Sequence, residues 1–131
     1  MNRRPLNNIL YIEDDPDIQT IARIALETVG GLAVRICGSG QEALELVTSG
    51  FAPDLILLDV MMPGMDGMST LVRLRKLPHT TATPAVFMTA KVQPSEVAQY
   101  RAQGALGVIA KPFDPMELAK QVRRLWESEL G

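Results

Sequence analysis

The sequence predicts an α/β fold, in which a doubly wound five-stranded parallel sheet carries helices on both faces. Two observations predict it: five strand-then-helix units follow one another, and the strands are short apolar runs without alternation. This strict succession favours parallel strands joined by right-handed crossovers. A length of 131 residues fits a single domain with a real hydrophobic core.

The first two units occupy the first 50 residues or so. A buried strand is expected over residues 9–12, followed by an acidic loop and one helix over about residues 16–29. The second strand is expected over residues 32–37, and because Arg35 interrupts it, we place it at a sheet edge. Ser39-Gly40-Gln41-Glu42 forms a capping box that opens a helix running to about Ser49.

The other three strands each end on a polar residue. They are expected over residues 55–59, 85–89 and 107–110, with helices over about residues 66–76 and 94–103 and a last one from Asp114. Asp114 as N-cap, Pro115 at the first helical position and Glu117 three residues after the cap predict where that last helix begins. Asp15 and Asp66 are likewise expected to cap helices.

Composition excludes several classes of protein. The net charge of −2 provides no basic field for phosphates, so we predict no direct nucleic-acid binding. The single cysteine, Cys37, excludes an internal disulfide and a cysteine-clustered zinc site, and is expected to be a small core residue. No apolar run approaches membrane-spanning length, and the first residues lack the apolar region of a secretion signal. A cytoplasmic location without membrane contact is therefore predicted.

Polar side chains follow four of the predicted strands. Residues 13–15 (Glu-Asp-Asp) follow the first strand, Asp59 ends the third, Thr89 the fourth, and Lys111 follows the fifth. Because the carboxyl ends of parallel strands share one edge, these groups are expected to converge. Adjacent carboxylates repel, and a bound Mg²⁺ would relieve that conflict. A cation, a hydroxyl and an ammonium around one carboxylate suit phosphoryl transfer to that carboxylate.

Four segments, each at a strand end, carry a family resemblance. From about residue 6 to 126 the chain resembles a receiver domain of a two-component response regulator. The segments are Ile9-Leu10-Tyr11-Ile12-Glu13-Asp14-Asp15, Leu57-Leu58-Asp59-Val60-Met61-Met62-Pro63-Gly64-Met65-Asp66-Gly67, Met88-Thr89-Ala90-Lys91 and Ala110-Lys111-Pro112-Phe113. The resemblance implies a flavodoxin-like fold with strand order 2-1-3-4-5. Because little chain remains beyond the last predicted helix, we expect residues 1–131 to form a single receiver domain, with a core over about residues 6–126 and no output domain. The chain would then be either a single-domain regulator or a receiver module of a larger protein.

The resemblance further implies a signalling role. Asp59 would accept a phosphoryl group from a histidine kinase or a histidine phosphotransfer protein, and Thr89 and Lys111 would contact the phosphoryl oxygens. The chain would not be an enzyme beyond catalysing its own phosphorylation and dephosphorylation. Phosphate on Asp59 would switch a face within residues 94–125 that binds a downstream protein or a second copy of the chain.

A magnesium site is implied beside Asp59. Asp14 would be a direct ligand, Glu13 would act through water, and Asp59 and the backbone carbonyl of Met61 would complete the protein's share. We expect Asp14 to be a buried like charge beside Asp59. Asp15 is expected to cap the first helix rather than bind the metal, and the Lys111–Pro112 peptide bond is expected to be cis.

One position departs from the family pattern. Receiver domains that switch by rotating a ring carry Tyr or Phe three residues before the lysine, where this chain has Val108. A valine fills space but cannot swing a ring into a pocket that the threonine vacates. We therefore expect backbone and loop movement instead of a side-chain flip.

Two enzymatic alternatives fit the sequence less well. The segment Gly38-Ser39-Gly40-Gln41-Glu42-Ala43 matches a dinucleotide fingerprint, with Asp59 about 20 residues further on. The capping box explains Ser39 and Glu42 more simply, and the match follows the second strand instead of the first. An aspartate-nucleophile phosphatase would carry a second acid two residues after Asp59, where this chain has Met61.

Overall fold

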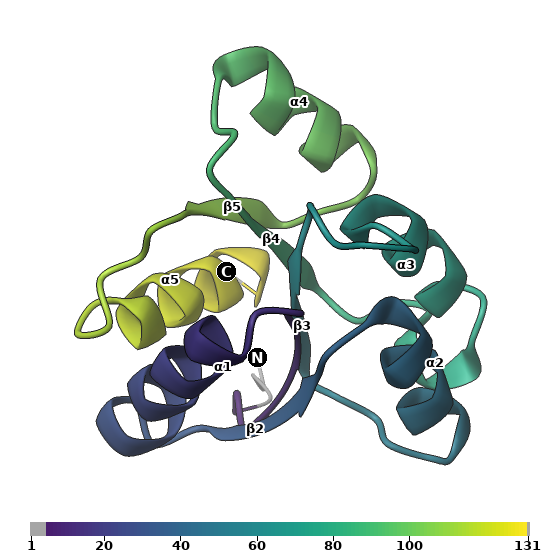
Figure 1. The fold of residues 1–131 in the computed structure, drawn as a ribbon, viewed down its shortest axis with the longest axis horizontal. Helices are drawn as coiled ribbons and strands as arrows, with labels where there is room; N and C mark the ends of the chain where they lie inside the picture. Colours follow the sequence, from purple (N-terminus) through teal and green to yellow (C-terminus); the bar gives the residue numbers. More distant parts are fainter. Residues whose placement is uncertain (1–4, 131) are drawn as a thin grey trace.

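A computed structural model describes residues 5–130 of the chain as one sheet with helices on both faces (Figure 1). Its five parallel strands lie in the order β2-β1-β3-β4-β5, which confirms the predicted topology. The strands are β1 (Asn8–Ile12), β2 (Ala33–Cys37), β3 (Leu55–Asp59), β4 (Ala85–Thr89) and β5 (Gly107–Ala110). The boundaries of β3, β4 and β5 are those predicted, because each apolar run stops at a polar residue or a turn.

The helices are divided between the two faces of the sheet. They are α1 (Pro16–Arg23), η1 (Ile24–Val29), α2 (Gly40–Thr48), α3 (Gly67–Leu74), η2 (Pro78–Thr80), α4 (Pro94–Ala102) and α5 (Leu118–Leu130). Figure 1 shows α1 and α5 side by side on one face and α2 and α3 on the other, with α4 standing apart beyond β4 and β5. Because all five strands are parallel, their carboxyl ends lie on one edge of the sheet.

Burial on both faces explains the unbroken apolar runs. Strand side chains alternate, so Ile9 and Tyr11 pack in the core beneath α1 and α5, while Leu10 and Ile12 pack beneath α2 and α3. All five residues of β3 are buried. Arg35 lies on the edge strand β2, as predicted, with its guanidinium 5.2 Å from the centre of the Phe51 ring.

Three predicted helix caps are confirmed. The Asp15 carboxylate accepts the Asp17 N–H at 2.9 Å, and the Asp66 carboxylate accepts the Ser69 N–H at 2.8 Å. The Ser39 hydroxyl accepts the Glu42 N–H at 3.1 Å. The Glu42 carboxylate accepts the N–H of Gly38, one residue before the cap, at 3.1 Å. These carboxylates and hydroxyls fix where the helices begin and therefore where the loops at the site end.

Two helix predictions need correction. The predicted helix over residues 16–29 is α-helical only to Arg23 and continues as the π-helical η1, because i→i+5 bonding is not encoded in a 3.6-residue periodicity. The last helix begins at Leu118, three residues later than predicted. The Asp114 carboxylate accepts the Met116 N–H at 2.9 Å, and the Asp114 carbonyl accepts the Glu117 N–H at 2.9 Å. This i→i+3 bonding forms a tight turn ahead of the helix.

Candidate functional site

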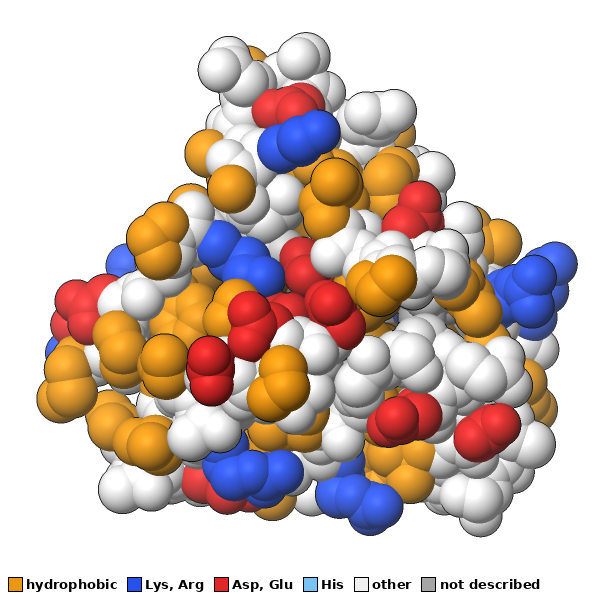
Figure 2. Space-filling view, viewed as in Figure 1, with side chains coloured by type: hydrophobic (Ala, Val, Ile, Leu, Met, Phe, Trp, Pro, Cys, Tyr) orange, Lys and Arg blue, Asp and Glu red, His pale blue; other side chains and the backbone are white. Residues whose placement is uncertain are grey.

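The strand ends bring the predicted site residues together. Carboxylate oxygens of Glu13, Asp14 and Asp59 lie within 4.8 Å of one another. The Lys111 ammonium lies 2.8 Å from Glu13 and 3.4 Å from Asp59. Figure 2 shows acidic side chains gathered near the centre of this face, with basic side chains beside them. Residues up to 98 positions apart in sequence thus form one cluster.

Asp59 is held in place by the backbone around it. It is the last residue of the central strand and only 6% exposed. Its Oδ1 accepts the Met61 N–H at 3.4 Å, and its Oδ2 faces Lys111. Behind it, a Cβ added at Gly67 would lie 2.1 Å from the Asp59 carbonyl oxygen. Glycine at the start of α3 therefore lets that helix pack directly against the backbone of Asp59.

Glu13 is fully buried, and its carboxylate accepts hydrogen bonds from three donors. Its Oε1 accepts hydrogen bonds from the Lys111 ammonium at 2.8 Å and the Tyr11 hydroxyl at 3.3 Å. Its Oε2 accepts the Asp15 N–H at 3.2 Å. Sequence reasoning missed Tyr11, although residues two apart in an extended segment share a face, so Tyr11 and Glu13 could have been paired. The hydroxyl holds the carboxylate from the core side.

The charges in the cluster perturb one another. Burial, and then the negative charge of Glu13, raise the pKa of Asp59, although Lys111 and the Met61 N–H act in the opposite direction. Burial alone would lower the pKa of Lys111, but its hydrogen bond and charge interaction with Glu13, together with Asp59, raise it overall. Burial, followed by the charge of Glu13, also raises the pKa of Tyr11, which keeps its hydroxyl a donor.

Thr89 lies next to Lys111 at the end of β4. It is 2% exposed, and its carbonyl accepts the Lys111 N–H at 3.0 Å. Its hydroxyl oxygen accepts the Lys91 N–H at 3.0 Å. The Lys111–Pro112 peptide bond is cis, as the resemblance implies. Thr89 and Lys111 therefore lie at the ends of adjacent strands on the same edge of the sheet, and the contact of Thr89 with a phosphoryl group stays a prediction.

The donor set fits a hard divalent cation. Three carboxylates within reach of one ion supply the oxygen ligands that Mg²⁺ prefers. Asp14 is exposed, which corrects the expectation that it would be a buried like charge, since the chain turns outward after the buried Glu13. Met61 donates its N–H to Asp59, and the ligand role of its carbonyl stays a prediction.

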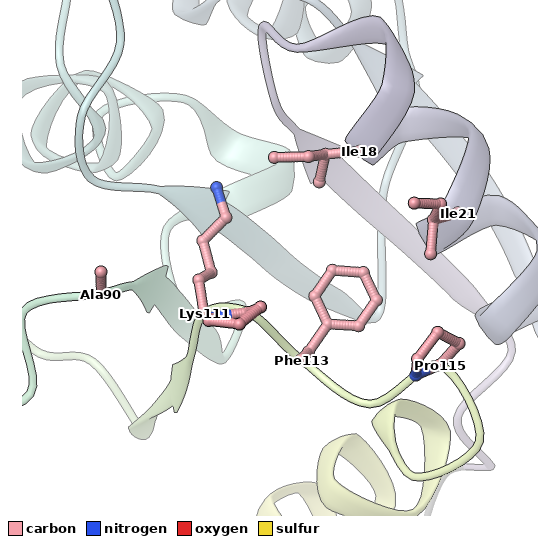
Figure 3. A pocket seen from close by; sticks show the side chains of 7 residues that line it. Ile18, Ile21, Ala90, Lys111, Phe113 and Pro115 are labelled. Carbon is pink, nitrogen blue, oxygen red and sulfur yellow. The ribbon is translucent and has the colours of Figure 1, made fainter.

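An apolar groove lies beside the cluster. It has a volume of about 410 Å³ and is lined by Ile18, Ile21, Ala90, Lys111, Pro112, Phe113 and Pro115. Figure 3 shows Ile18 and Ile21 of α1 facing Phe113 and Pro115 across the groove. Ile21 is 44% exposed although it is a large apolar side chain. Because Lys111 also contacts Asp59, the groove and the acidic cluster share a wall.

The residues of the dinucleotide fingerprint have other roles. Ser39 and Glu42 are engaged in capping α2. A Cβ added at Gly40 would lie 2.2 Å from the Thr70 hydroxyl oxygen, so this glycine permits the close packing of α2 on α3. The pattern that resembled a phosphate-binding loop thus serves the start and packing of a helix.

The strand order and the residues at the carboxyl ends of the strands together indicate the kind of domain. A buried aspartate ends the central strand of a 2-1-3-4-5 parallel sheet, with an acidic pair, a threonine and a lysine on the same edge. This combination is typical of phosphoacceptor signalling domains. Residues 9–123 match the family described as the response regulator receiver domain, and the chain belongs to that family.

Similar proteins agree with this assignment. The chain is 34% identical over 117 residues to an uncharacterized 14.6 kDa protein from Leptolyngbya boryana, covering 89% of this chain and 88% of that protein. It is 36% identical over 115 residues to the DNA-binding response regulator MtrA of Mycolicibacterium smegmatis, covering 88% of this chain and 48% of MtrA. It is 32% identical to the regulatory protein AtoC of Escherichia coli, covering 91% of this chain but 25% of AtoC. The chain therefore spans half or less of these two regulators.

Solved structures show the same fold. The chemotaxis protein CheY4 of Vibrio cholerae superposes with a TM-score of 0.84 at 28% identity, covering 92% of this chain and 99% of CheY4. The signal receiver domain of a histidine kinase from Syntrophus aciditrophicus superposes with a TM-score of 0.77 at 32% identity, covering 93% of this chain and 91% of that domain. The same fold thus occurs in a chemotaxis protein and in the receiver domain of a histidine kinase.

Neither direct nucleic-acid contact nor membrane contact is predicted for this chain. MtrA is named as a DNA-binding regulator, so the absence of direct nucleic-acid contact stays a prediction for this chain. Within residues 5–130, none of the helices has the length and apolar character needed to cross a bilayer.

Proposed function

We propose that this chain receives a phosphoryl group on Asp59 from a histidine kinase or a histidine phosphotransfer protein and thereby carries a phosphorelay signal. The observation that carries the proposal is the position of Asp59. It is a buried carboxylate at the end of the central strand, in contact with the Lys111 ammonium and within reach of the acidic pair Glu13 and Asp14. A carboxylate in such a setting is a suitable phosphoryl acceptor.

Transfer to Asp59 is a displacement at phosphorus. A carboxylate oxygen of Asp59 attacks the phosphorus of a phosphohistidine, the new O–P bond forms, and the N–P bond breaks with its electron pair returning to the imidazole. Lys111 leaves Glu13 for a phosphoryl oxygen, and the Thr89 hydroxyl donates to another. Both groups exchange a present partner for the phosphoryl oxygens, and there they stabilise the negative charge of the phosphoryl group.

We further propose that Mg²⁺ is required. When bound, it would neutralise the acidic cluster and the phosphoryl oxygens. The exposed Asp14 is placed to bind the ion directly. Glu13 already accepts Lys111, Tyr11 and an N–H group, which supports its contact with the ion through water. The Met61 carbonyl is proposed as a further ligand, since its N–H group contacts Asp59.

We propose that the same site also hydrolyses the aspartyl phosphate and so ends the signal. A water oxygen attacks the phosphorus of the aspartyl phosphate, the Asp59 O–P bond breaks, and inorganic phosphate leaves with the carboxylate restored. The chain would therefore catalyse its own phosphorylation and dephosphorylation, without turning over another substrate.

The donor protein is proposed to dock in the groove beside the site. The groove is apolar, exposes Ile21, and shares Lys111 with the cluster, so a protein seated there would lie next to Asp59. Ile21→Lys should slow transfer from a phosphorylated kinase at least tenfold and leave phosphorylation by acetyl phosphate unchanged. Val72→Lys on α3 is the matched control, since Val72 is 48% exposed and lies outside the groove. Equal effects of both substitutions on transfer would refute this docking site.

Intact mass tests the proposed function itself. Treatment with acetyl phosphate and Mg²⁺ should add one phosphoryl group to the wild type, and chelation of the metal should prevent it. Asp59→Asn should abolish the gain, whereas Asp17→Asn, which alters an exposed aspartate of α1, should retain it. An undiminished gain of mass in Asp59→Asn would show that the acceptor is a different residue.

A further inference from the structure

Helix α4 is held to the domain chiefly by one side chain. Of its nine residues, Pro94–Ala102, only Tyr100 is buried, and it is 4% exposed. The Tyr100 ring packs on Phe87 of β4, with the ring centres 5.3 Å apart and the planes tilted by 50°. An isolated helix of this length is marginal in water, since about 12–15 residues are needed for independent stability. The position of α4 therefore depends on Tyr100.

A short series of hydrogen bonds connects this residue to the site. The Tyr100 hydroxyl donates to the Lys91 carbonyl at 3.4 Å, and the Lys91 N–H donates to the Thr89 hydroxyl oxygen at 3.0 Å. The N–H of Lys91 therefore contacts the site residue Thr89, and the carbonyl of Lys91 contacts α4. If the Thr89 hydroxyl were displaced, the Lys91 N–H would lose its acceptor, and the backbone that carries the Lys91 carbonyl would lose one of its two anchors.

We propose that Tyr100 is the residue through which phosphorylation of Asp59 changes the attachment of α4. This inference rests on the proposed function, because it needs a phosphoryl group that draws the Thr89 hydroxyl toward it. The Lys91 N–H then loses its acceptor, the β4–α4 segment shifts, and the Tyr100 hydroxyl loses the Lys91 carbonyl. The helix keeps its ring contact with Phe87 but is less firmly attached.

The strand β5 explains why this role falls to α4. Val108 lies directly beside Phe87 in the β4–β5 register, at the position where ring-switching receivers carry Tyr or Phe. A valine supplies neither a ring nor a hydroxyl there. The aromatic neighbour of Phe87 comes instead from α4, and its hydroxyl binds the segment that follows Thr89. The coupling element is therefore on the helix that moves.

Amide hydrogen exchange of the full chain tests the proposal. Peptides covering residues 94–102 and 60–64 are followed with and without beryllofluoride and Mg²⁺, which mimic the phosphoryl group on Asp59. In the wild type the mimic should speed exchange in α4 about fivefold, the effect expected for one lost hydrogen bond. Tyr100→Phe keeps the ring and removes only the hydroxyl. It should show the faster α4 exchange already without the mimic, and no further change with it.

Val97→Ala is the matched control on the same helix. Val97 is half-buried, so this substitution should loosen α4 without touching Lys91, and the response to the mimic should persist. An α4 response of the wild-type size in Tyr100→Phe would overturn the proposal, provided that residues 60–64 respond. A wild type that gains no phosphoryl mass and shows no change in residues 60–64 would instead overturn the proposed function.

Discussion

Replacing Asp14 by asparagine should make the metal-free domain more stable. The Asp14 carboxylate lies within 4.8 Å of the carboxylates of Glu13 and Asp59. The Lys111 ammonium contacts Glu13 and Asp59, so it offsets part of their charge. Asparagine keeps the shape of the side chain and removes its charge. The substitution therefore measures the repulsion between Asp14 and the carboxylates of Glu13 and Asp59 in the metal-free site.

The size of the effect follows from distance and exposure. Two unit charges 4.8 Å apart repel by about 3.5 kcal/mol at an effective dielectric constant of 20 and by about 0.9 kcal/mol at 80. Asp14 is exposed and Lys111 offsets part of the opposing charge, so the lower value applies. A gain of about 1 kcal/mol would raise the Tm of a domain of this size by about 3–5 °C.

Thermal unfolding with and without Mg²⁺ checks this prediction. At a Mg²⁺ concentration of about ten times its Kd, the wild type should gain about 1.4 kcal/mol, whereas Asp14→Asn should gain little because a ligand is lost. The order of stabilities should therefore reverse when the metal is added. Glu127→Gln, an exposed change on α5, should leave both values unaltered. A metal-free Asp14→Asn that is less stable than the wild type would refute the reasoning.

Three further outcomes are expected. Burial and the charge of Glu13 raise the pKa of Asp59 above 3.8, so the native state binds a proton on Asp59 more tightly than the unfolded chain does. The native state therefore loses stability as the pH rises from about 3.8 through the raised pKa of Asp59. In metal-free denaturant titrations, Asp59→Asn should therefore be more stable than the wild type near pH 7, with the difference vanishing below about pH 4. Gly67→Ala should destabilise the fold by about 1–3 kcal/mol and slow phosphorylation by acetyl phosphate. Gly38→Ala should do neither, because its added Cβ would lie 3.6 Å from the nearest atom, Oε1 of Glu42, which is ordinary van der Waals contact. Lys111→Met should keep Mg²⁺ binding measurable by calorimetry but slow phosphorylation at least a hundredfold.

The positions of the site residues could be predicted because they interrupt strong patterns. An apolar run that stops at Asp59, Thr89 or Lys111 marks the end of a buried strand, and the parallel topology brings such ends together. Caps such as Asp15 and Asp66 were equally accessible, since a short polar side chain before a helix has few other roles. Local rules sufficed wherever the partner is close in sequence.

The contacts within the site could not be predicted in the same way. The Glu13–Lys111 pair joins residues 98 positions apart, and its distance depends on how β1 and β5 are spaced across the sheet. Tyr100 was overlooked because one aromatic residue on a short polar helix gives no periodic signal. The outward turn at Asp14 and the π-helical end after Arg23 are also properties of the packed chain and not of local propensity.

The position of Lys111 leaves room for the proposed cation to act on Asp59. Its ammonium is closer to Glu13, at 2.8 Å, than to Asp59, at 3.4 Å. Because Glu13 takes the shorter contact, Lys111 only partly offsets the burial and repulsion that raise the pKa of Asp59. A cation beside Asp14 would supply the missing charge and favour the ionised, nucleophilic form of Asp59. An incoming phosphoryl group would then give Lys111 a new anion to bind, so loss of the Glu13 contact and phosphorylation of Asp59 are expected to occur together.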